Sequence, residues 1–203
     1  MSDSPHDALR TDPDLGPLVE AHGELTLDPA EDLFERLVVA ILRQQVSMAS
    51  AAATRERLFD AVTVTPDGIR AADDEVLRDA GLSRQKTRYV NAVADAFLEH
   101  GYSLAHFADH TDDEIREALT DITGVGDWTA DMLLMFAFGR EDVFPVGDLG
   151  IRKGFETVVG EGYDRAEMTD YAERWSPYRS YASLYLWRAD EDIADSVDEV
   201  SED

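Results

Sequence analysis

The chain has 203 residues, a size that fits one domain or two small lobes sharing a core. It contains no cysteine, which excludes disulfides, thiolate metal sites, a cysteine nucleophile and a thiolate-held iron–sulfur cluster. No apolar run approaches the roughly 18 residues that a membrane helix needs, and the polar N-terminus is unlike a signal peptide, so we expect a cytoplasmic protein without membrane contact.

The charge is strongly negative, with 44 acids against 18 bases and a net charge of −26. Such a surface suits a soluble acidic protein or one adapted to concentrated salt, and by itself it argues against a nucleic-acid partner. The acids gather at the ends, with ten acids and one arginine in 1–35 and eight acids and no base in 189–203. We therefore expect an acidic N-terminal segment over 1–30 and an acidic tail over 189–203, both solvated, on either side of a domain over 31–188.

The body of the chain predicts helices throughout and shows no strand alternation. Asp28–Glu31 resembles a capping box, and apolar residues follow it at helical spacing. In chain order, the expected helices cover 32–45, 47–62, a short stretch from 66, 73–80, 84–100, 112–121, a stretch from 127, 150–159, 169–175 and 176–189. The sequence thus predicts an all-α fold of nine or ten helices.

Residues 119–155 are the most informative part of the chain. A helix is expected to end near Asp121, a Thr-Gly-Val-Gly turn to follow, and a second helix to start near Asp127. Gly124 and Gly126 permit unusual backbone conformations and remove side chains where another chain must come close. Amides at the start of the second helix would suit a phosphate. The same glycines also fit an ordinary turn between two helices.

Two windows of the chain carry bases and no acid. Arg84, Lys86 and Arg88 lie in 80–94, and three arginines lie in 174–189, among them Arg179. Phosphate contact would explain acid-free windows in so acidic a chain, and gaps left by core helices would explain them too.

Four motifs together resemble the HhH-GPD superfamily of helix-hairpin-helix DNA glycosylases, in its DNA-3-methyladenine glycosylase II branch. They are LVVAILRQQVSMASA, GLSRQKTRYVNAVADAF, LTDITGVGDWTA followed by DVFPVGD, and RWSPYRSYASLYLW. The resemblance spans about residues 30–188. It implies a helix-hairpin-helix glycosylase fold in two small lobes with the active-site cleft between them and the hairpin at about 114–138.

The resemblance implies that Asp148 is the catalytic residue. Its carboxylate would stabilise the positive charge that develops on the deoxyribose, or orient the attacking water. A base alkylated on a ring nitrogen is already cationic and leaves readily, so one carboxylate suffices where other glycosidases need two. Asp148 also suits the N-cap of the helix that follows it, and both roles are compatible.

The base pocket implied by the resemblance contains Trp128, Trp187, Met132 and Leu149. Trp128 stands where the lyase branch has a lysine, so no Schiff base is expected there, and its ring would stack on a flipped cationic base. Core packing is the competing role for either tryptophan. Met132 and Leu149 occupy positions that are aromatic in some members of the branch, which leaves the preferred lesion open.

The remaining implied site residues contact DNA or a cation. Gln45 aligns with the wedge that fills the gap left by the flipped nucleotide, and a polar residue at a helix end is its alternative role. The backbone contacts are expected from Gly124, Gly126, Thr129, Lys86, Arg152 and Arg179. The carbonyls of Thr120, Ile122 and Val125 would hold a K⁺ or Na⁺ ion at the hairpin, and no other cofactor is expected to be required.

The expected function is hydrolytic removal of alkylated bases, such as 3-methyladenine or 7-methylguanine, from double-stranded DNA by a monomer, leaving an abasic site. One alternative is a glycosylase of the same fold for deaminated, mismatched or oxidised bases. Another is a non-catalytic hairpin module that binds DNA. Because molar salt screens the field of the acidic segments, activity is expected to tolerate or need high salt.

Overall fold

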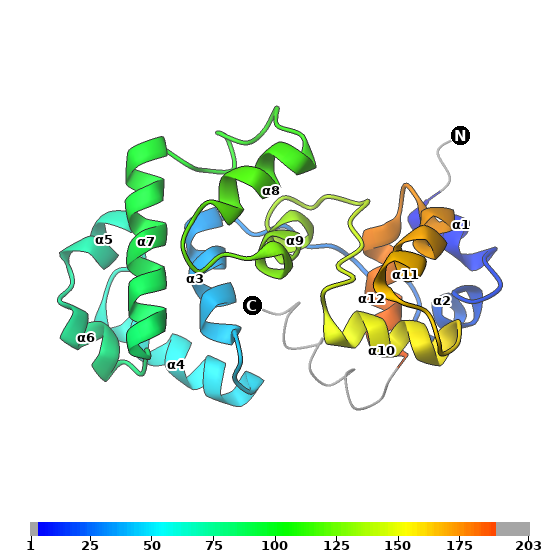
Figure 1. The fold of residues 1–203 in the computed structure, drawn as a ribbon, viewed down its shortest axis with the longest axis horizontal. Coiled ribbons are helices and arrows are strands. Elements are labelled where there is room, and N and C mark those ends of the chain that lie inside the picture. The colour runs from blue at the N-terminus through cyan, green and yellow to red at the C-terminus, as the bar shows by residue number, and fades with distance from the viewer. Residues whose placement is uncertain (1–3, 190–203) are drawn as a thin grey trace. The chain divides into compact units, whose positions relative to one another are not determined.

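The computed structural model describes residues 4–189, and these form twelve α-helices, one short 3-10 helix and no strand (Figure 1). They divide into two compact units, unit 1 with residues 4–29 and 139–189 and unit 2 with residues 30–138. The all-α prediction is confirmed. None of the helices in this part of the chain combines the length and the apolar character required to cross a bilayer.

Unit 2 is organised around one long helix. Its elements are α3 (Leu33–Arg43), α4 (Met48–Ala61), α5 (Pro66–Ala71), α6 (Asp74–Asp79), α7 (Arg84–His100), α8 (Asp112–Thr120) and α9 (Asp127–Phe136). Helix α7 packs against α5 and α6 on one side and α3 on the other, and α3 also packs on α9 (Figure 1). Because it has neighbours on several sides, α3 buries eight of its eleven residues.

Local capping chemistry explains most helix boundaries in unit 2. The Ser83 hydroxyl accepts from the Lys86 amide at the start of α7, and Gly101 ends this helix with φ of 68°. Thr111 and Glu114 form the predicted capping box of α8. The box predicted at 28–31 is wrong, since α3 begins at Leu33 with Asp32 as its cap. The Ala30 amide instead donates to the carbonyl of Phe136 at 3.0 Å, so this stretch makes a tertiary contact.

Unit 1 is built around the C-terminal helix. Its elements are α1 (Pro5–Arg10), α2 (Gly16–His22), α10 (Leu149–Val158), α11 (Arg165–Ala172), the 3-10 helix η1 (Glu173–Trp175) and α12 (Arg179–Arg188). Helix α12 packs on α10, α2, α1 and η1, and seven of its ten residues are buried. With neighbours all round, α12 has no polar face, which is why its sequence shows no amphipathic stripe.

The prediction of a solvated N-terminal segment is wrong for residues 5–22, which form α1 and α2. Leu9, Leu15 and Val19 are 0–2% exposed, and the Tyr185 hydroxyl of α12 donates to the carbonyl of Gly23 at 2.7 Å. These two helices account for the difference between the nine or ten expected and the twelve found among the described residues. The predicted acidic tail lies, beyond residue 189, outside the described residues.

Candidate active site and hairpin

Asp148 lies at the N-cap of α10 and is half-buried. Its Oδ1 accepts two hydrogen bonds, from the Ile151 amide at 3.0 Å and from the indole Nε1 of Trp187 at 3.0 Å. The first is the capping bond that the sequence predicted, while the second comes from α12, far along the chain. Two donors on one oxygen restrict rotation of the carboxylate.

Arg152 braces the loop that carries Asp148. Its Nη1 donates to the carbonyls of Val146 at 3.2 Å, Gly147 at 2.7 Å and Asp148 at 3.2 Å. These contacts hold the backbone immediately before α10 in place. Arg152 was predicted to contact the DNA backbone, but its Nη1 donates to carbonyls of the protein itself. The neighbouring Lys153 is exposed.

The two predicted pocket residues of unit 1 differ in exposure. Leu149 is 60% exposed, whereas Trp187 is 7% exposed with its indole edge against α10. A Cβ added to Gly150 would lie 2.8 Å from Cδ1 of Trp187 and 3.0 Å from Oδ1 of Asp148. Gly150 was not predicted from the sequence. Its position two residues after Asp148 is the signal by which it could have been found.

The two hairpin glycines between α8 and α9 have different structural roles. Gly124 has φ of 99°, and a Cβ there would lie 2.2 Å from Cγ of Tyr89, so this glycine is required by the fold. Gly126 is the N-cap of α9, makes no side-chain capping bond, and a Cβ there would meet nothing within 4 Å. The start of α9 therefore presents backbone amides beside open space, which suits an anion.

A residue that the sequence did not single out ties the hairpin to α3. Gln44 donates from Nε2 to the carbonyl of Gly124 at 3.0 Å and to the hydroxyl of Thr129 at 3.2 Å. Thr129 is 2% exposed and its hydroxyl lies inside unit 2, so any contact of this residue with the DNA backbone would be made by its main chain, and that contact stays a prediction. The sequence feature by which Gln44 could have been found is its position next to Gln45 at the end of a buried helix.

Helix α9 also carries the two predicted pocket residues of unit 2. Trp128 and Met132 are four residues apart, so they share a face of the helix, and both are half-buried. Elsewhere on α9, Asp131 pairs with Arg116 of α8 at 3.0 Å. Burial raises the pKa of Asp131, and the hydrogen bonds from Arg116 only partly oppose this shift. The pair joins the two helices of the hairpin.

The basic window over 174–189 contains no acid in sequence, but the fold brings acids from other segments against its arginines. Arg179 donates from Nε and Nη2 to the two carboxylate oxygens of Asp142 at 2.7 and 3.0 Å, and its Nη1 binds Glu173. Arg174 lies 3.4 Å from Asp14. The predicted contact of Arg179 with the DNA backbone is therefore not supported, because its donors are used by carboxylates of its own unit.

The window over 80–94 behaves differently. Arg84 and Arg88 on α7 are exposed, and neither forms an ion pair with any residue that the structure describes. Lys86 turns inward, where its Nζ donates to the carbonyl of Leu42 at the end of α3 and burial lowers its pKa. The two arginines, rather than the lysine, are the cations that this window offers to solvent.

Gln45 lies at the rim of a hollow of about 230 Å³ between α3, α4 and α7. Gln45 is exposed and has φ of 58°, a left-handed conformation that is unfavourable for a side chain of its kind. Among the residues that the structure describes, no acid lines the hollow, whose lining is Leu42, Gln44, Gln45, Val46, Ser50, Thr54, Gly81, Ser83, Gln85, Lys86 and Tyr89. In a chain of net charge −26, a polar hollow that is lined by α7 and by none of the described acids is the part of unit 2 best suited to phosphates, since α7 also carries the exposed Arg84 and Arg88.

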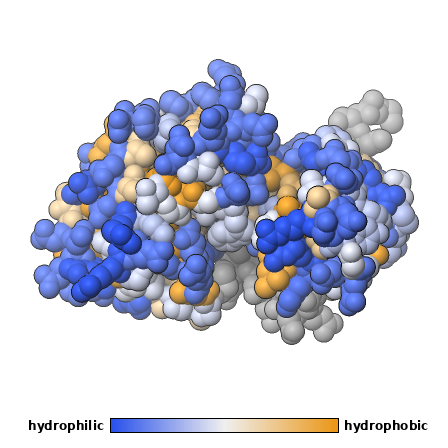
Figure 2. Space-filling model, viewed as in Figure 1, coloured by the Kyte–Doolittle hydropathy of each residue, from blue (hydrophilic) through white to orange (hydrophobic). Residues whose placement is uncertain are grey.

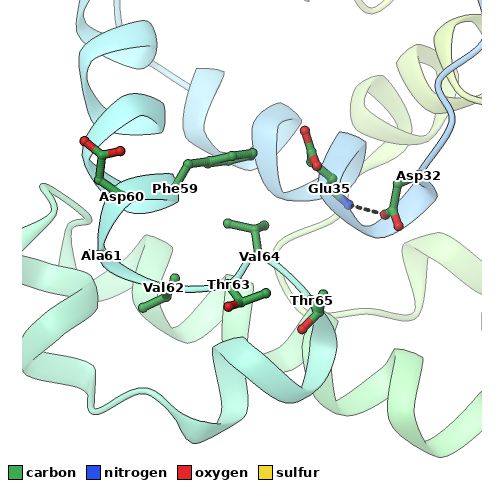
Figure 3. A pocket seen from close by; sticks show the side chains of 9 residues that line it. All are labelled: Asp32, Glu35, Phe59, Asp60, Ala61, Val62, Thr63, Val64 and Thr65. Atoms are coloured by element: carbon green, nitrogen blue, oxygen red, sulfur yellow. Dashed lines mark hydrogen bonds between the residues drawn. The ribbon is translucent and has the colours of Figure 1, made fainter.

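A second and larger hollow of about 600 Å³ has the opposite character (Figure 3). Asp32, Glu35 and Asp60 line it together with Phe59 and the turn after α4, and none of the predicted site residues is among its lining. Its acids would repel a phosphate backbone. The face of the protein seen in Figure 2 is largely hydrophilic.

The hairpin carbonyls are the remaining candidate for holding an ion. Ile122 and Val125 are 6% exposed, and the Ile122 carbonyl already accepts from the Val125 amide at 3.0 Å. A carbonyl has two lone pairs, so this bond leaves one for a cation. Within the described residues, no group of three or more histidine, aspartate or glutamate side chains is placed to bind a metal.

Comparison with known proteins places the chain among DNA repair enzymes. A family model described as HhH-GPD superfamily base excision DNA repair protein matches residues 38–177. DNA-3-methyladenine glycosylase 2 of Escherichia coli is 33% identical over 85% of this chain and 63% of its own length. DNA-3-methyladenine glycosylase 1 of Schizosaccharomyces pombe is 31% identical over 76% of this chain and 71% of its own. The structure of the S. pombe 3-methyladenine DNA glycosylase with abasic DNA superposes with a TM-score of 0.82 at 28% identity, covering 91% of this chain and 95% of that one.

Proposed function

Because this chain belongs to the HhH-GPD superfamily of base excision DNA repair proteins, we propose that it is a monofunctional DNA glycosylase for alkylated bases. It would cleave the N-glycosidic bond of a base such as 3-methyladenine or 7-methylguanine and leave an abasic site. The chain spans 63% and 71% of the two curated relatives reported above, both of which are named for 3-methyladenine.

The observation that carries this proposal is the carboxylate of Asp148. It stands at the N-terminus of α10, with its Oδ1 bound by an amide and an indole N–H. The loop behind it is held by Arg152, so the carboxylate is oriented before any substrate arrives. Preorganised charge of this kind is the main means by which an enzyme stabilises a charged transition state.

The reaction requires little besides this charge. The bond from C1′ of the deoxyribose to the base nitrogen breaks, and the electron pair leaves with the base. The sugar becomes cationic, water adds to C1′, and the water's proton passes to solvent. Asp148 stabilises the cation or orients the water. A base methylated on a ring nitrogen leaves as a neutral molecule, so no second acidic group is needed.

The chemistry proposed for α9 is recognition rather than bond cleavage. Trp128 offers an indole face to a cationic base, an attraction of about 1–2 kcal/mol when water is excluded. It also occupies the position where a lysine would make the enzyme a lyase. Hence the DNA strand should stay intact after excision and break only on treatment with alkali.

Binding of double-stranded DNA is proposed for unit 2, around the hollow at Gln45 and the start of α9. The start of α9 at Gly126 would take one phosphate, and the exposed Arg84 and Arg88 would take others, with Gln45 as the wedge. A K⁺ or Na⁺ ion held by the hairpin carbonyls would add positive charge beside the phosphate. Stabilisation against heat by KCl, but not by tetramethylammonium chloride at equal concentration, would test this ion. The acting species is proposed to be a monomer.

The test is incubation with methylated duplex DNA in molar KCl, with free bases measured by chromatography and the strands analysed before and after alkali. Release of methylated purines, with strand breaks only after alkali, is the expected result. Binding of the DNA without release of any methylated base would contradict the proposed lesion class.

Replacing Asp148 with Asn tests the catalytic residue. Asn still caps a helix, so the fold should survive, while excision should fall about 100-fold or more. DNA binding should persist or improve, because a negative charge is removed. Asp164→Asn is the matched control, since Asp164 caps α11 in the same unit by accepting from the Glu167 amide at 2.9 Å. Excision by Asp148→Asn at the rate of this control would refute the assignment.

A further inference from the structure

We infer that Trp187 is a positioning residue for Asp148, acting through its indole N–H, and that Gly150 is small because it admits the indole to this contact. The inference rests on the proposed function of Asp148. It replaces the expectation that Trp187 acts chiefly as a wall of the base pocket.

The contact joins two elements that pack within unit 1. Nε1 of Trp187, on α12, donates to Oδ1 of Asp148, at the start of α10, at 3.0 Å. Because Trp187 is 7% exposed, its ring is held by the packing of α12 and does not sample other orientations freely. The Ile151 amide and the indole donate to the same carboxylate oxygen from two different helices, so together they define its orientation better than the amide does.

Gly150 gives independent support for this contact. A Cβ at this position would lie 2.8 Å from Cδ1 and 3.0 Å from Nε1 of Trp187, and also 3.0 Å from Oδ1 of Asp148. Any larger residue would therefore push the indole and the carboxylate apart. The backbone of Gly150 is helical and needs no positive φ, so the close approach of the indole is what requires a glycine here.

Trp175 in the same unit provides the comparison. It is 2% exposed, and its Nε1 has no hydrogen-bond partner among the residues that the structure describes. Replacing either tryptophan with Phe keeps a buried aromatic ring and removes one indole N–H. Only at Trp187 does that N–H contact a group proposed to act in the reaction, so the pair of substitutions separates positioning from packing.

The experiment measures single-turnover excision of a methylated purine, the dissociation constant for the same DNA, and thermal stability for Trp187→Phe, Trp175→Phe and the unsubstituted protein. We expect Trp187→Phe to reduce the excision rate about 10- to 100-fold, the usual effect of losing a hydrogen bond to a charged group. Its dissociation constant should stay within about twofold, because the residue acts after binding. Trp175→Phe should retain the full rate.

Two outcomes would overturn the inference. A parallel loss of affinity and rate in Trp187→Phe would indicate that the ring stacks on the base. Equal losses of rate in both variants would indicate packing alone.

A measurement that does not depend on activity keeps this inference distinct from the proposed function. The chain has three tryptophans, so three indole N–H signals are expected in a ¹⁵N spectrum, and the Phe variants assign them. Asp148→Ala, which removes the accepting oxygen that Asn would keep, should shift the Trp187 signal and speed its exchange with solvent, and it should leave the Trp175 signal in place. An unmoved Trp187 signal would refute the contact, whereas absence of excision by the unsubstituted protein would refute the proposed function.

Discussion

Substitution of Gly124 with Ala should destabilise the protein through the hairpin, and the structure supplies the magnitude. The backbone at Gly124 has φ of 99°, and a residue with a side chain loses about 1–2 kcal/mol in a left-handed conformation. The new Cβ would lie 2.2 Å from Cγ and 2.7 Å from Cβ of Tyr89. These atoms are at the root of the ring, so the clash cannot be relieved by rotating its end, and overpacking of this kind costs about 1–3 kcal/mol.

The expected loss in the free energy of unfolding is therefore about 2–5 kcal/mol. In a protein of this size it corresponds to a fall in melting temperature of roughly 4–20 °C. Urea denaturation followed by circular dichroism measures the first quantity, and a thermal scan measures the second. Shortening Tyr89 to Ala in the same chain should recover part of the loss, since it removes the ring atoms from the clash but leaves the Cβ of residue 89 and the strained backbone.

Gly126→Ala is the matched control two residues further on. Its φ of −109° is accessible to any residue, and a Cβ there meets nothing within 4 Å, so the loss in stability should stay below about 1 kcal/mol. Its affinity for DNA should nevertheless fall, because the added methyl group stands where a phosphate is proposed to approach. Equal stability of the Gly124 variant and the unsubstituted protein, or equal destabilisation by both substitutions, would refute the reasoning.

Three further predictions concern charge and hairpin geometry. Burial by itself would raise the pKa of Asp142, but hydrogen bonds from Arg179 and Ser176 hold it below its usual 3.8. The stabilisation by the ionised Asp142 is complete above its unfolded-state pKa and is lost as the pH falls through its pKa in the folded protein. Arg179→Ala should therefore lower the free energy of unfolding, measured in urea, by about 1–2 kcal/mol at pH 7 and by less at pH 3. Equal losses at the two pH values would contradict this prediction. Excision should persist or rise between 0.1 and 1 M KCl, where the Debye length falls from about 10 to about 3 Å, and a steep loss would refute the role given to the acidic surface. Gln44→Ala should weaken DNA binding several-fold with little change in single-turnover rate, because it frees the hairpin at Gly124; an unchanged dissociation constant would count against this.

Local signals explain why so many helices were predictable. Ser83 and Thr111 form capping bonds with amides three residues away, so nothing distant is needed to place these helix starts. The hairpin was likewise predictable, because a glycine with positive φ has few substitutes at a tight turn. The N-terminal helices were missed because their few apolar residues are hidden among acids in the sequence. Only packing against α12 reveals that these residues are buried.

The sequence by itself determined the helical fold, the hairpin and the place of Asp148 at the start of α10, since each depends on neighbours within a few residues. Only the tertiary structure decided which charges and aromatic groups are available. It pairs Arg179 with Asp142, 37 positions earlier, and brings the indole of Trp187 to a carboxylate 39 positions before it. A residue type states what a side chain is able to donate or accept, but its partner depends on how distant helices pack, and that information is spread over the whole core.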